Sequence, residues 1–342
     1  MSLPGDVAVP AERATRVALA LGSGGARGYA HVGVIQVLVE RGYDIVTIAG
    51  SSMGALVGGL HAARALEPYT EWVTSLSQLD VLRLLDPSLS SPGAIKAEKV
   101  FAKVRELLGG VLIEDMAVPF TAVAADLFAG REVWFQRGPA DVAIRASIAI
   151  PTVITPVMHN GRLLADGGLL NPVPIAPLAA ARADATIAVS LGGDRVGERP
   201  GERRGLGGAP DHASAAPRPV EEWGDRFRRM AANVMDRESI KALMARFDRG
   251  RERGQDDDDD PGLPAGLGKA DVLTQSLEVM QSVLTRYRLA SYPPDLLITI
   301  SRDACRSLDF HRAEEMIAVG RAATIEALDH AELTPTLPVT SG

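Results

Sequence analysis

The sequence predicts an α/β fold, in which a mostly parallel sheet carries helices on its faces. Residues 17–21 and 45–49 are short apolar runs that suit buried strands, and each leads through a glycine-rich turn into a helical segment. Strand, loop and helix in this repeated order are typical of parallel strands joined by crossover helices. The chain has 342 residues and 46% apolar side chains, enough for one large domain or two smaller ones.

Composition excludes several classes of protein. A net charge of −7 gives no basic footprint for nucleic acid, and the single Cys305 excludes an internal disulfide framework and fits a reducing compartment. Residues 1–16 have no uninterrupted apolar run of the kind that signal peptides carry. No segment approaches the roughly 18 apolar residues of a membrane span. We therefore expect a cytoplasmic protein, with a peripheral membrane contact as the alternative.

Residues 22–28, Gly-Ser-Gly-Gly-Ala-Arg-Gly, form a loop between the first strand and a helix predicted over 29–40. The spacing of a dinucleotide-binding loop is absent, because Arg27 stands where the third glycine would fall when counted from Gly22, and no acidic residue follows the second strand. Consecutive glycines let backbone N–H groups approach a substrate oxygen, so we interpret this loop as part of an oxyanion hole. For Arg27, binding a phosphate headgroup and bonding carbonyls to hold the loop are both open.

The second strand ends in Gly50-Ser51-Ser52-Met53-Gly54, a G-x-S-x-G pentapeptide, and a small-residue helix follows it. A serine on such a strand-to-helix turn projects its hydroxyl outward, and the flanking glycines avoid a clash where strand and helix approach. The helix N-terminus then favours negative charge beside Ser52. The alternative is an incidental serine in a glycine-rich turn. We expect Ser52 to be a nucleophile.

The middle of the chain alternates between predicted helices and strands. A turn follows the strand at 120–125, and Asp126 in that turn is expected to accept backbone N–H bonds. The remaining elements predicted here are helices over 69–79, 95–108 and 140–150, and a strand over 132–135.

A hairpin is predicted next, with strands at 153–160 and 162–165 joined by Asn160-Gly161. Its second strand delivers Asp166-Gly167-Gly168. A carboxylate at the end of a rigid strand, with glycines leaving room beside it, is well placed for proton transfer. The more common role for such an aspartate is to cap the turn. A helix to Ala183 and a strand at 185–191 are expected to follow.

Residues 193–265 read as a flexible linker that contains an amphipathic helix at 221–253. One face carries Trp223 and Phe227, and the other is dense in arginine. This helix is either a lid or membrane-surface element, or a helix packed on the domain. The aspartate run at 256–260 lacks the alternating spacing of a calcium loop, so we expect no metal site there.

The last part of the chain contains an amphipathic helix at 270–290, a strand at 296–300 and a helix at 311–328. The apolar strand predicts that this region returns to complete the first domain. We therefore divide the chain into a disordered segment 1–16, a catalytic core 17–192, the linker and helical insert 193–265, a completing segment 266–330 and a tail 331–342.

Ser52 needs a base, because a serine hydroxyl is a weak nucleophile at neutral pH. His31 and His61 lie beyond the two loops and His212 lies in the linker, so structural or surface roles are favoured for all three. A triad of Ser52, Asp166 and His311 would follow the hydrolase chain order, although Asp309 before His311 also suits a helix N-cap.

The three motifs together, residues 22–28, 50–54 and 166–168, occur in the order and approximate spacing of the patatin-like phospholipases. The sequence resembles the bacterial branch related to neuropathy target esterase. The resemblance extends through residues 146–151 and 166–174, covers about residues 17–192 strongly, and covers 309–315 more weakly. One departure is Ser23, where many members have a third glycine.

The resemblance implies a three-layer α/β/α sandwich and a Ser–Asp dyad, with Ser52 as nucleophile and Asp166 as base. It implies no cofactor and no metal, and a lipid or lysophospholipid ester as substrate. Gly50, Gly54, Gly167 and Gly168 are its motif glycines. The expected oxyanion hole comprises Gly24, Gly25, Ala26, Arg27, Gly28 and Met53.

The residues themselves agree with this mechanism. A free aspartate is a weak base at pH 7, so burial in an apolar cleft should raise the pKa of Asp166. We expect a serine acyl hydrolase that works through an acyl-enzyme. The alternatives are an acyltransferase, for which His311 would matter, and a regulatory or scaffold protein with a vestigial site.

Overall fold

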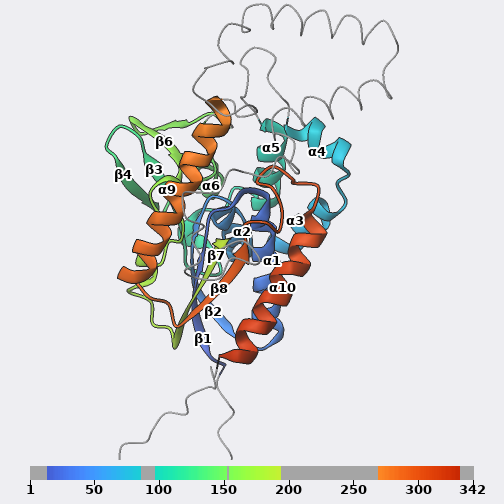
Figure 1. The fold of residues 1–342 in the computed structure, drawn as a ribbon, viewed down its shortest axis with the longest axis vertical. Coiled ribbons are helices and arrows are strands. Elements are labelled where there is room, and N and C mark those ends of the chain that lie inside the picture. The colour runs from blue at the N-terminus through green and yellow to red at the C-terminus, as the bar shows by residue number, and fades with distance from the viewer. Residues whose placement is uncertain (1–13, 86–96, 152–153, 194–268, 332–342) are drawn as a thin grey trace, which may run out of the picture. The chain divides into compact units, whose positions relative to one another are not determined.

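The computed structural model describes residues 14–85, 97–151, 154–193 and 269–331, and Figure 1 shows the fold. Nearly all of the predicted linker, with the helix expected at 221–253 and the aspartate run at 256–260, lies outside the described residues.

The described strands form one eight-stranded sheet with the order β5-β6-β3-β2-β1-β7-β8, and β4 pairs with β3 off this path. Neighbours among β1, β2, β3, β7 and β8 are parallel, whereas β4, β5 and β6 run antiparallel to their partners. The predicted mostly parallel α/β sheet is confirmed. The strands are β1 (Arg16–Leu21), β2 (Asp44–Ser51), β3 (Phe120–Asp126), β4 (Arg131–Phe135), β5 (Val157–His159), β6 (Arg162–Asp166), β7 (Ala185–Gly193) and β8 (Leu296–Ser301).

Helices cover both faces of this sheet. The α-helices in the described part of the chain are α1 (Ala30–Glu40), α2 (Met53–Ala62), α3 (Leu66–Thr74), α4 (Gln78–Leu85), α5 (Glu98–Leu108), α6 (Ala140–Ser147), α9 (Lys269–Ser291) and α10 (Ala313–His330). Short 3-10 helices are η1 (Gly25–Tyr29), η2 (Ile113–Asp115), η3 (Gly167–Leu169) and η4 (Ala176–Leu178).

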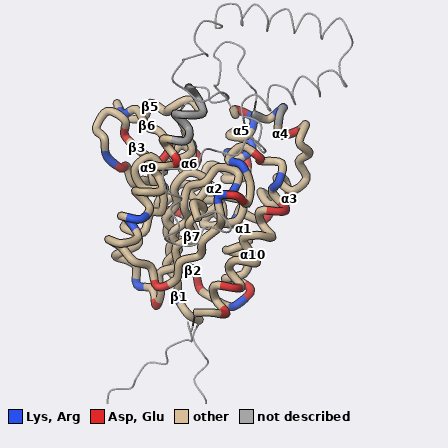
Figure 2. The backbone as a smooth tube through the Cα atoms, in the orientation of Figure 1, with Lys and Arg blue, Asp and Glu red and all other residues tan. Residues whose placement is uncertain are grey.

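The two faces of the parallel strands differ in side-chain size. On one face Val17, Leu19 and Leu21 of β1 join the large core formed with α1, α2 and α10. On the other face Ala18 and Ala20 join small side chains of β2 and β7, against which the segment before β7 and the end of α9 pack closely. The result is three layers, helix, sheet and helix, as the sequence predicts. Figure 2 shows that the central strands carry charged residues only at their ends, as buried parallel strands require.

Two glycines let α1 and α10 cross in close contact. A Cβ on Gly33 would lie 2.1 Å from the carbonyl oxygen of Ile317, and one on Gly320 would lie 2.0 Å from that of Ala30. α10 also contacts η1, the helical turn within the glycine-rich loop. The C-terminal helix therefore supports the loop that the sequence assigns to the active site.

The strand predicted at 296–300 is β8, which pairs with β7 in parallel. The single helix predicted over 69–79 is wrong, because α3 ends at Thr74 and α4 begins at Gln78. Ser77 and Asp80 exchange hydrogen bonds, with the Asp80 carboxylate accepting from Ser77 N at 3.1 Å. This reciprocal capping starts a new helix.

Several other predicted elements are shorter than expected. The helix predicted over 140–150 is α6, which ends at Ser147. The helix to Ala183 is only η4, since Pro172, Pro174 and Pro177 remove N–H donors and restrict the residues before them. The strand at 153–160 is limited to β5, which begins after Pro156. α10 begins at Ala313, two residues after the predicted start.

The N-cap predicted for that last helix is also wrong. Arg312 occupies the N-cap position of α10 and makes no capping bond through its side chain. Asp309 instead lies in the preceding turn, where its carboxylate accepts from Arg306 N at 3.4 Å.

Candidate active site

Ser52 occupies the turn between β2 and α2 in a strained backbone conformation. Its φ of 57° and ψ of −125° are rarely adopted by a residue with a side chain. Ser52 is the N-cap of α2, yet its side chain makes no capping bond. Serine normally uses its hydroxyl to cap a helix at this position. Here the hydroxyl donates to Asp166 Oδ2 at 2.6 Å instead.

Asp166 ends β6 and is held by two further contacts. Its Oδ1 accepts from Gly168 N at 2.7 Å, and its own N–H donates to the carbonyl of Ala149 at 2.9 Å. The turn-capping role and the contact with Ser52 therefore occur in the same carboxylate, one on each oxygen. Burial raises the pKa of Asp166 to about 6, while the bonds from Ser52 and Gly168 act in the opposite direction.

The sheet explains how residues 114 positions apart come together. β4 occupies one edge of β3 from Ala122 to Asp126. A strand has two edges, so β2 and β6 must share the other one. β2 ends with Ser51 opposite Val123, and β6 ends with Asp166 opposite Ala124, the next residue of β3. The two strands therefore meet end to end, and their last residues bring the hydroxyl and the carboxylate together.

Ser147, the last residue of α6, fixes the backbone of this turn. Its hydroxyl donates to the carbonyl of Val123 at 2.6 Å and accepts from Ser52 N at 3.0 Å. With Ala149 bonded to Asp166 N, the end of α6 contacts both halves of the Ser–Asp pair. Sequence reasoning assigned no role to Ser147. The available signal was a hydroxyl at the C-terminal end of the helix predicted over 140–150.

The glycine-rich loop makes several backbone hydrogen bonds. Gly22 N donates to Val189 O at 3.0 Å, and Ser23 N donates to Pro172 O at 2.8 Å. Ala26 N donates to Ser307 O at 2.9 Å. The N–H of Ala26, one of the expected oxyanion donors, therefore has a long-range backbone partner in this structure. Among the described residues, no partner accepts from the amides of Gly24, Gly25 or Met53.

Glycines make the close approach of these loops sterically feasible. A Cβ on Gly28 would lie 2.2 Å from the Cβ of Met53, and one on Gly54 would lie 2.1 Å from the carbonyl oxygen of Leu21. A Cβ on Gly168 would lie 2.6 Å from the hydroxyl of Ser23. Gly28 thus lets the loop reach the residue beside Ser52. Gly168 thereby accommodates the side chain of Ser23.

Arg27 joins the loop to the segment between β8 and α10. Its guanidinium donates to the carbonyl of Arg302 at 2.9 Å, to that of Cys305 at 3.3 Å and to the hydroxyl of Ser307 at 3.3 Å. Of the two roles considered for Arg27, these bonds correspond to the structural one. The carbonyls of Arg302 and Cys305 that accept from it belong to a segment distant in sequence, so Arg27 ties that segment to the glycine-rich loop.

No histidine in the described residues hydrogen-bonds to Ser52 or Asp166. His31 is fully buried, and its Nε2 donates to the carbonyl of Gly22 at 2.8 Å, so it supports the loop as expected. Burial lowers the pKa of His31 to about 4, which keeps the ring neutral. His311 precedes α10. In a triad a histidine lies between the serine and the aspartate, but here Ser52 bonds directly to Asp166.

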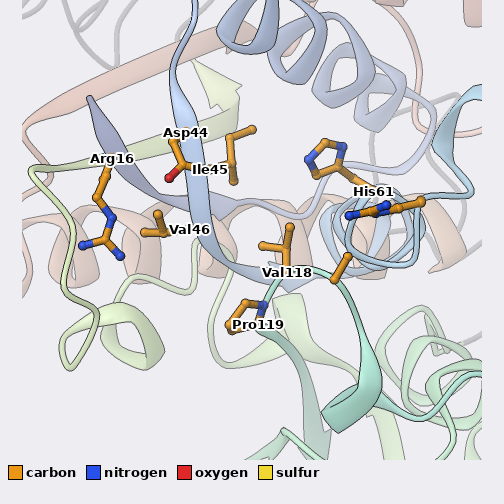
Figure 3. Close-up of a pocket in the computed structure, with 9 residues that line it drawn as sticks. Arg16, Asp44, Ile45, Val46, His61, Val118 and Pro119 are labelled. Atoms are coloured by element: carbon orange, nitrogen blue, oxygen red, sulfur yellow. The ribbon is translucent and has the colours of Figure 1, made fainter. Parts of the chain in front are cut away.

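Both reactive side chains are covered, with Ser52 2% and Asp166 3% exposed. A separate surface pocket of about 480 Å³ lies between the first residues of β1 and β2 and the end of α2, where Figure 3 shows Arg16, Asp44 and His61. Along β2 the pocket begins at Val46, roughly 20 Å from Ser52, and along α2 it begins at His61, roughly 14 Å away. It is therefore not where ester cleavage by Ser52 would occur.

The described residues contain no group of three or more His, Cys, Asp or Glu side chains that could hold a metal ion. Within them, no helix combines the length and the apolar composition needed to cross a bilayer.

Comparison with known proteins places these motifs in context. A family model described as patatin-like phospholipase matches residues 19–179. An uncharacterized NTE family protein of Mycobacterium tuberculosis is 48% identical over 362 aligned positions, which cover 97% of each chain. Lysophospholipase NTE1 of Mycosarcoma maydis is 33% identical over 184 positions, covering 52% of this chain and 10% of that protein. The crystal structure of VipD from Legionella pneumophila matches with a TM-score of 0.42 and 14% identity, covering 93% of this chain and 67% of that chain.

Proposed function

Because the chain belongs to the NTE family and carries a patatin-like phospholipase domain, we propose that it is a serine acyl hydrolase that cleaves carboxylic esters of lipids. One observation carries the proposal. The hydroxyl of Ser52, on a strained strand-to-helix turn, donates directly to a buried carboxylate at 2.6 Å. A nucleophile within hydrogen-bond reach of its base is the arrangement that acyl transfer requires.

In the proposed acylation step, Ser52 Oγ attacks the ester carbonyl carbon while its proton passes to Asp166 Oδ2. The pKa of Asp166, raised to about 6 by burial, makes this carboxylate a better base than an exposed aspartate while leaving it ionised at pH 7. Collapse of the tetrahedral intermediate breaks the bond to the leaving alcohol, which takes the proton from Asp166. An acyl-enzyme on Ser52 results.

The oxyanion would be bound by backbone N–H groups on two sides. Gly24 and Gly25 are the proposed donors from the loop, and Met53 at the start of α2 is the third. Gly28 instead allows the loop to pack against Met53, and Arg27 anchors the loop to the segment after β8. One such donor typically lowers the barrier by about 3 kcal/mol.

In deacylation, a water molecule gives one proton to Asp166 and attacks the acyl carbonyl. The bond to Ser52 Oγ breaks, Ser52 recovers the proton from Asp166, and the free acid leaves. Every proton therefore passes between Asp166 and an oxygen atom, so the cycle needs neither a metal ion nor a histidine.

A lipid or lysophospholipid ester is the proposed substrate class. The family match supports a lipid, and the Mycosarcoma maydis relative, named as a lysophospholipase, supports a single-chain phospholipid as the first compound to test.

The test is covalent labelling by a fluorophosphonate probe, read by peptide mass spectrometry. We expect label on the Ser52 peptide of the wild type, none in Ser52→Ala, and a rate lowered by at least about 100-fold in Asp166→Asn. His311→Ala serves as the control and should label at the wild-type rate. Hydrolysis of a lysophospholipid should follow the same pattern.

Absence of label on a folded wild-type protein would contradict the proposal and favour a scaffold with a vestigial site. Loss of label in folded His311→Ala would replace the dyad with a histidine-dependent mechanism.

A further inference from the structure

Two neighbouring hairpins extend beyond the end of the sheet at which Ser52 lies. Ser51 is in register with Val123, but β3 continues to Asp126 before it turns, and β6 returns from Arg162. At about 3.3 Å per residue, both turns lie roughly 10–15 Å past the level of Ser52.

These hairpins carry large apolar side chains in solvent. Leu127 is 43% exposed, Phe128 is 72% exposed and Met158 is 61% exposed. Leu127 N donates to the carbonyl of Leu163 at 2.9 Å, and Leu163 is the register partner of Met158. Leu127 and Met158 therefore lie in one row across three adjacent strands, about 10 Å apart. We call Leu127, Phe128 and Met158 the hairpin ridge.

The turn that presents Phe128 is fixed by a buried carboxylate. Asp126 is 3% exposed, and its Oδ1 accepts from Phe128 N at 3.0 Å and from Ala129 N at 3.1 Å. Gly130, with a φ of 61°, closes the turn by donating to the carbonyl of Asp126 at 2.9 Å. The exposure of Phe128 is thus imposed by an ordered turn. A large apolar side chain held in solvent in this way is typical of a contact surface.

The charges beside the ridge are positive. In residues 126–131 and 157–163, the exposed charged side chains are those of Arg131 and Arg162, and the one carboxylate, Asp126, is buried. Arg162 Nε lies 3.9 Å from Asp126 Oδ2, and this ion pair links the two hairpins. An apolar tip flanked by arginine complements a lipid surface whose headgroups are anionic.

We propose that the hairpin ridge docks on the surface of an anionic phospholipid bilayer. Phe128 and Met158 enter the interface, and Arg131 and Arg162 lie beside the headgroups. The inference rests on the proposed function in one respect: a lipid-ester hydrolase takes its substrate from a membrane, and the ridge lies at the same end of the sheet as Ser52. This contact is made by the core and does not require the predicted helix at 221–253.

The test is flotation of the full-length protein with vesicles of phosphatidylcholine and phosphatidylglycerol, and with vesicles of phosphatidylcholine alone. Replacing Phe128→Ser together with Met158→Ser should lower the partition coefficient by about tenfold or more. Arg131→Gln should lower it roughly fivefold, only on anionic vesicles and at low salt. The matched control is Val39→Ser with Ile325→Ser, which removes exposed apolar side chains, 53% and 38% exposed, from α1 and α10. It should float like the wild type.

Four outcomes would overturn the docking proposal. The first is a wild type that does not float, and the second is a ridge variant that floats as well as the wild type while its thermal unfolding is unchanged. The third is loss of flotation in Trp223→Ser with Phe227→Ser but not in the ridge variant, which would move the contact to residues 221–253. The fourth concerns the state of association. An unchanged flotation with loss of a dimer in sedimentation would assign the ridge to a contact between copies.

The same samples separate this proposal from the proposed function. Fluorophosphonate labelling of Ser52 without lipid should proceed in the ridge variant, whereas Ser52→Ala should float normally and take no label. A wild type that is labelled but does not float would refute the ridge alone. A wild type that floats through the ridge but takes no label would refute the hydrolase alone.

Discussion

At the level of single residues, the carboxylate of Asp166 connects burial with reactivity. It is 3% exposed and bonded to Ser52 and Gly168, yet desolvation outweighs these bonds and raises its pKa to about 6. The same group is therefore ionised at pH 7 and basic enough to take a proton from a hydroxyl. An exposed aspartate meets only the first of these requirements.

This pKa predicts the pH dependence of the proposed reaction. Because only ionised Asp166 can accept the proton of Ser52, kcat/KM should rise with pH through a single ionisation near pH 6 and then level off. The measurement is the pH profile of hydrolysis of a soluble short-chain ester. A midpoint near pH 4 would show that Asp166 is not desolvated in the free enzyme.

Ser147 acts on the reaction through Ser52 and is a positioning residue. Ser147→Ala would leave Ser52 N and the carbonyl of Val123 without their partner, so the turn would lose its fixed geometry. We expect kcat to fall by about 10–100-fold with KM little changed, and Ser147→Thr to recover part of the loss.

The control for Ser147→Ala is Ser51→Ala. Ser51 is also fully buried beside Ser52, but its hydroxyl has no hydrogen-bond partner among the described residues. Its removal should leave kcat within about twofold of the wild type, since no bond is lost. Equal losses in the two variants would show that the region is sensitive to any change, and Ser147 would have no specific role.

At the level of helices and strands, glycine placement decides which elements can touch. Gly33 and Gly320 bring α1 and α10 into backbone contact, and Gly28 brings η1 against the start of α2. The element boundaries that prediction missed also have local causes. The capping pair Ser77 and Asp80 divides α3 from α4. Both residues are visible in the sequence, but the prediction of one helix over 69–79 followed the apolar spacing and disregarded them.

The crossing of α1 and α10 gives a stability prediction. Gly320→Ala adds a Cβ 2.0 Å from the carbonyl oxygen of Ala30, a backbone atom that can move only with its helix. Alanine favours helix by about 1 kcal/mol over glycine, but we expect the clash to prevail and lower the free energy of unfolding by about 1–3 kcal/mol.

Chemical denaturation measures this effect, and Gly192→Ala is the control. A Cβ on Gly192 meets no atom within 4 Å, so that variant should unfold like the wild type. An increase in stability for Gly320→Ala would mean that the two helices separate freely, and that their close approach is not required.

For the whole molecule, the proposed active site lowers stability at neutral pH. Asp166 has a pKa of about 6 in the folded protein, against an ordinary pKa of 3.8 for an aspartate, so the folded state binds the proton more tightly. Protonated Asp166 therefore stabilises the folded protein at low pH, and this stabilisation is lost as the pH rises from about 4 to 6. Asp166→Asn should raise the free energy of unfolding by about 1–3 kcal/mol at pH 8 and by much less at pH 4.

Denaturation of the wild type and Asp166→Asn at the two pH values isolates this contribution. Other groups cancel in the difference, including His31, whose pKa lowered to about 4 acts in the opposite direction by favouring folding as pH rises through the same region. A wild type more stable than the variant at pH 8 would show that the bonds to the carboxylate outweigh its burial.

Much of the fold and of the candidate site follows from local sequence. The two turns at 22–28 and 50–54, the strands before them and the helices after them were predictable because glycine placement and apolar periodicity act over a few residues. Ser52 and Asp166 stood out for the same reason, each at the end of an apolar strand before small residues. The family resemblance supplied the pairing of the two as a hypothesis.

Contacts between distant residues could not be read from these local patterns. Ser52 meets Asp166 because β2 and β6 share one edge of β3, and the end of α6 supplies Ser147 to the same turn. The N–H of Ala26 donates to the carbonyl of Ser307, and the Arg27 side chain reaches the segment after β8. Both contacts form because β8 and α10 return to pack beside the first strands. Strand order and helix crossing depend on how the whole chain buries its apolar surface. Local backbone preference therefore specified the turns, and the complete core specified which of them face each other.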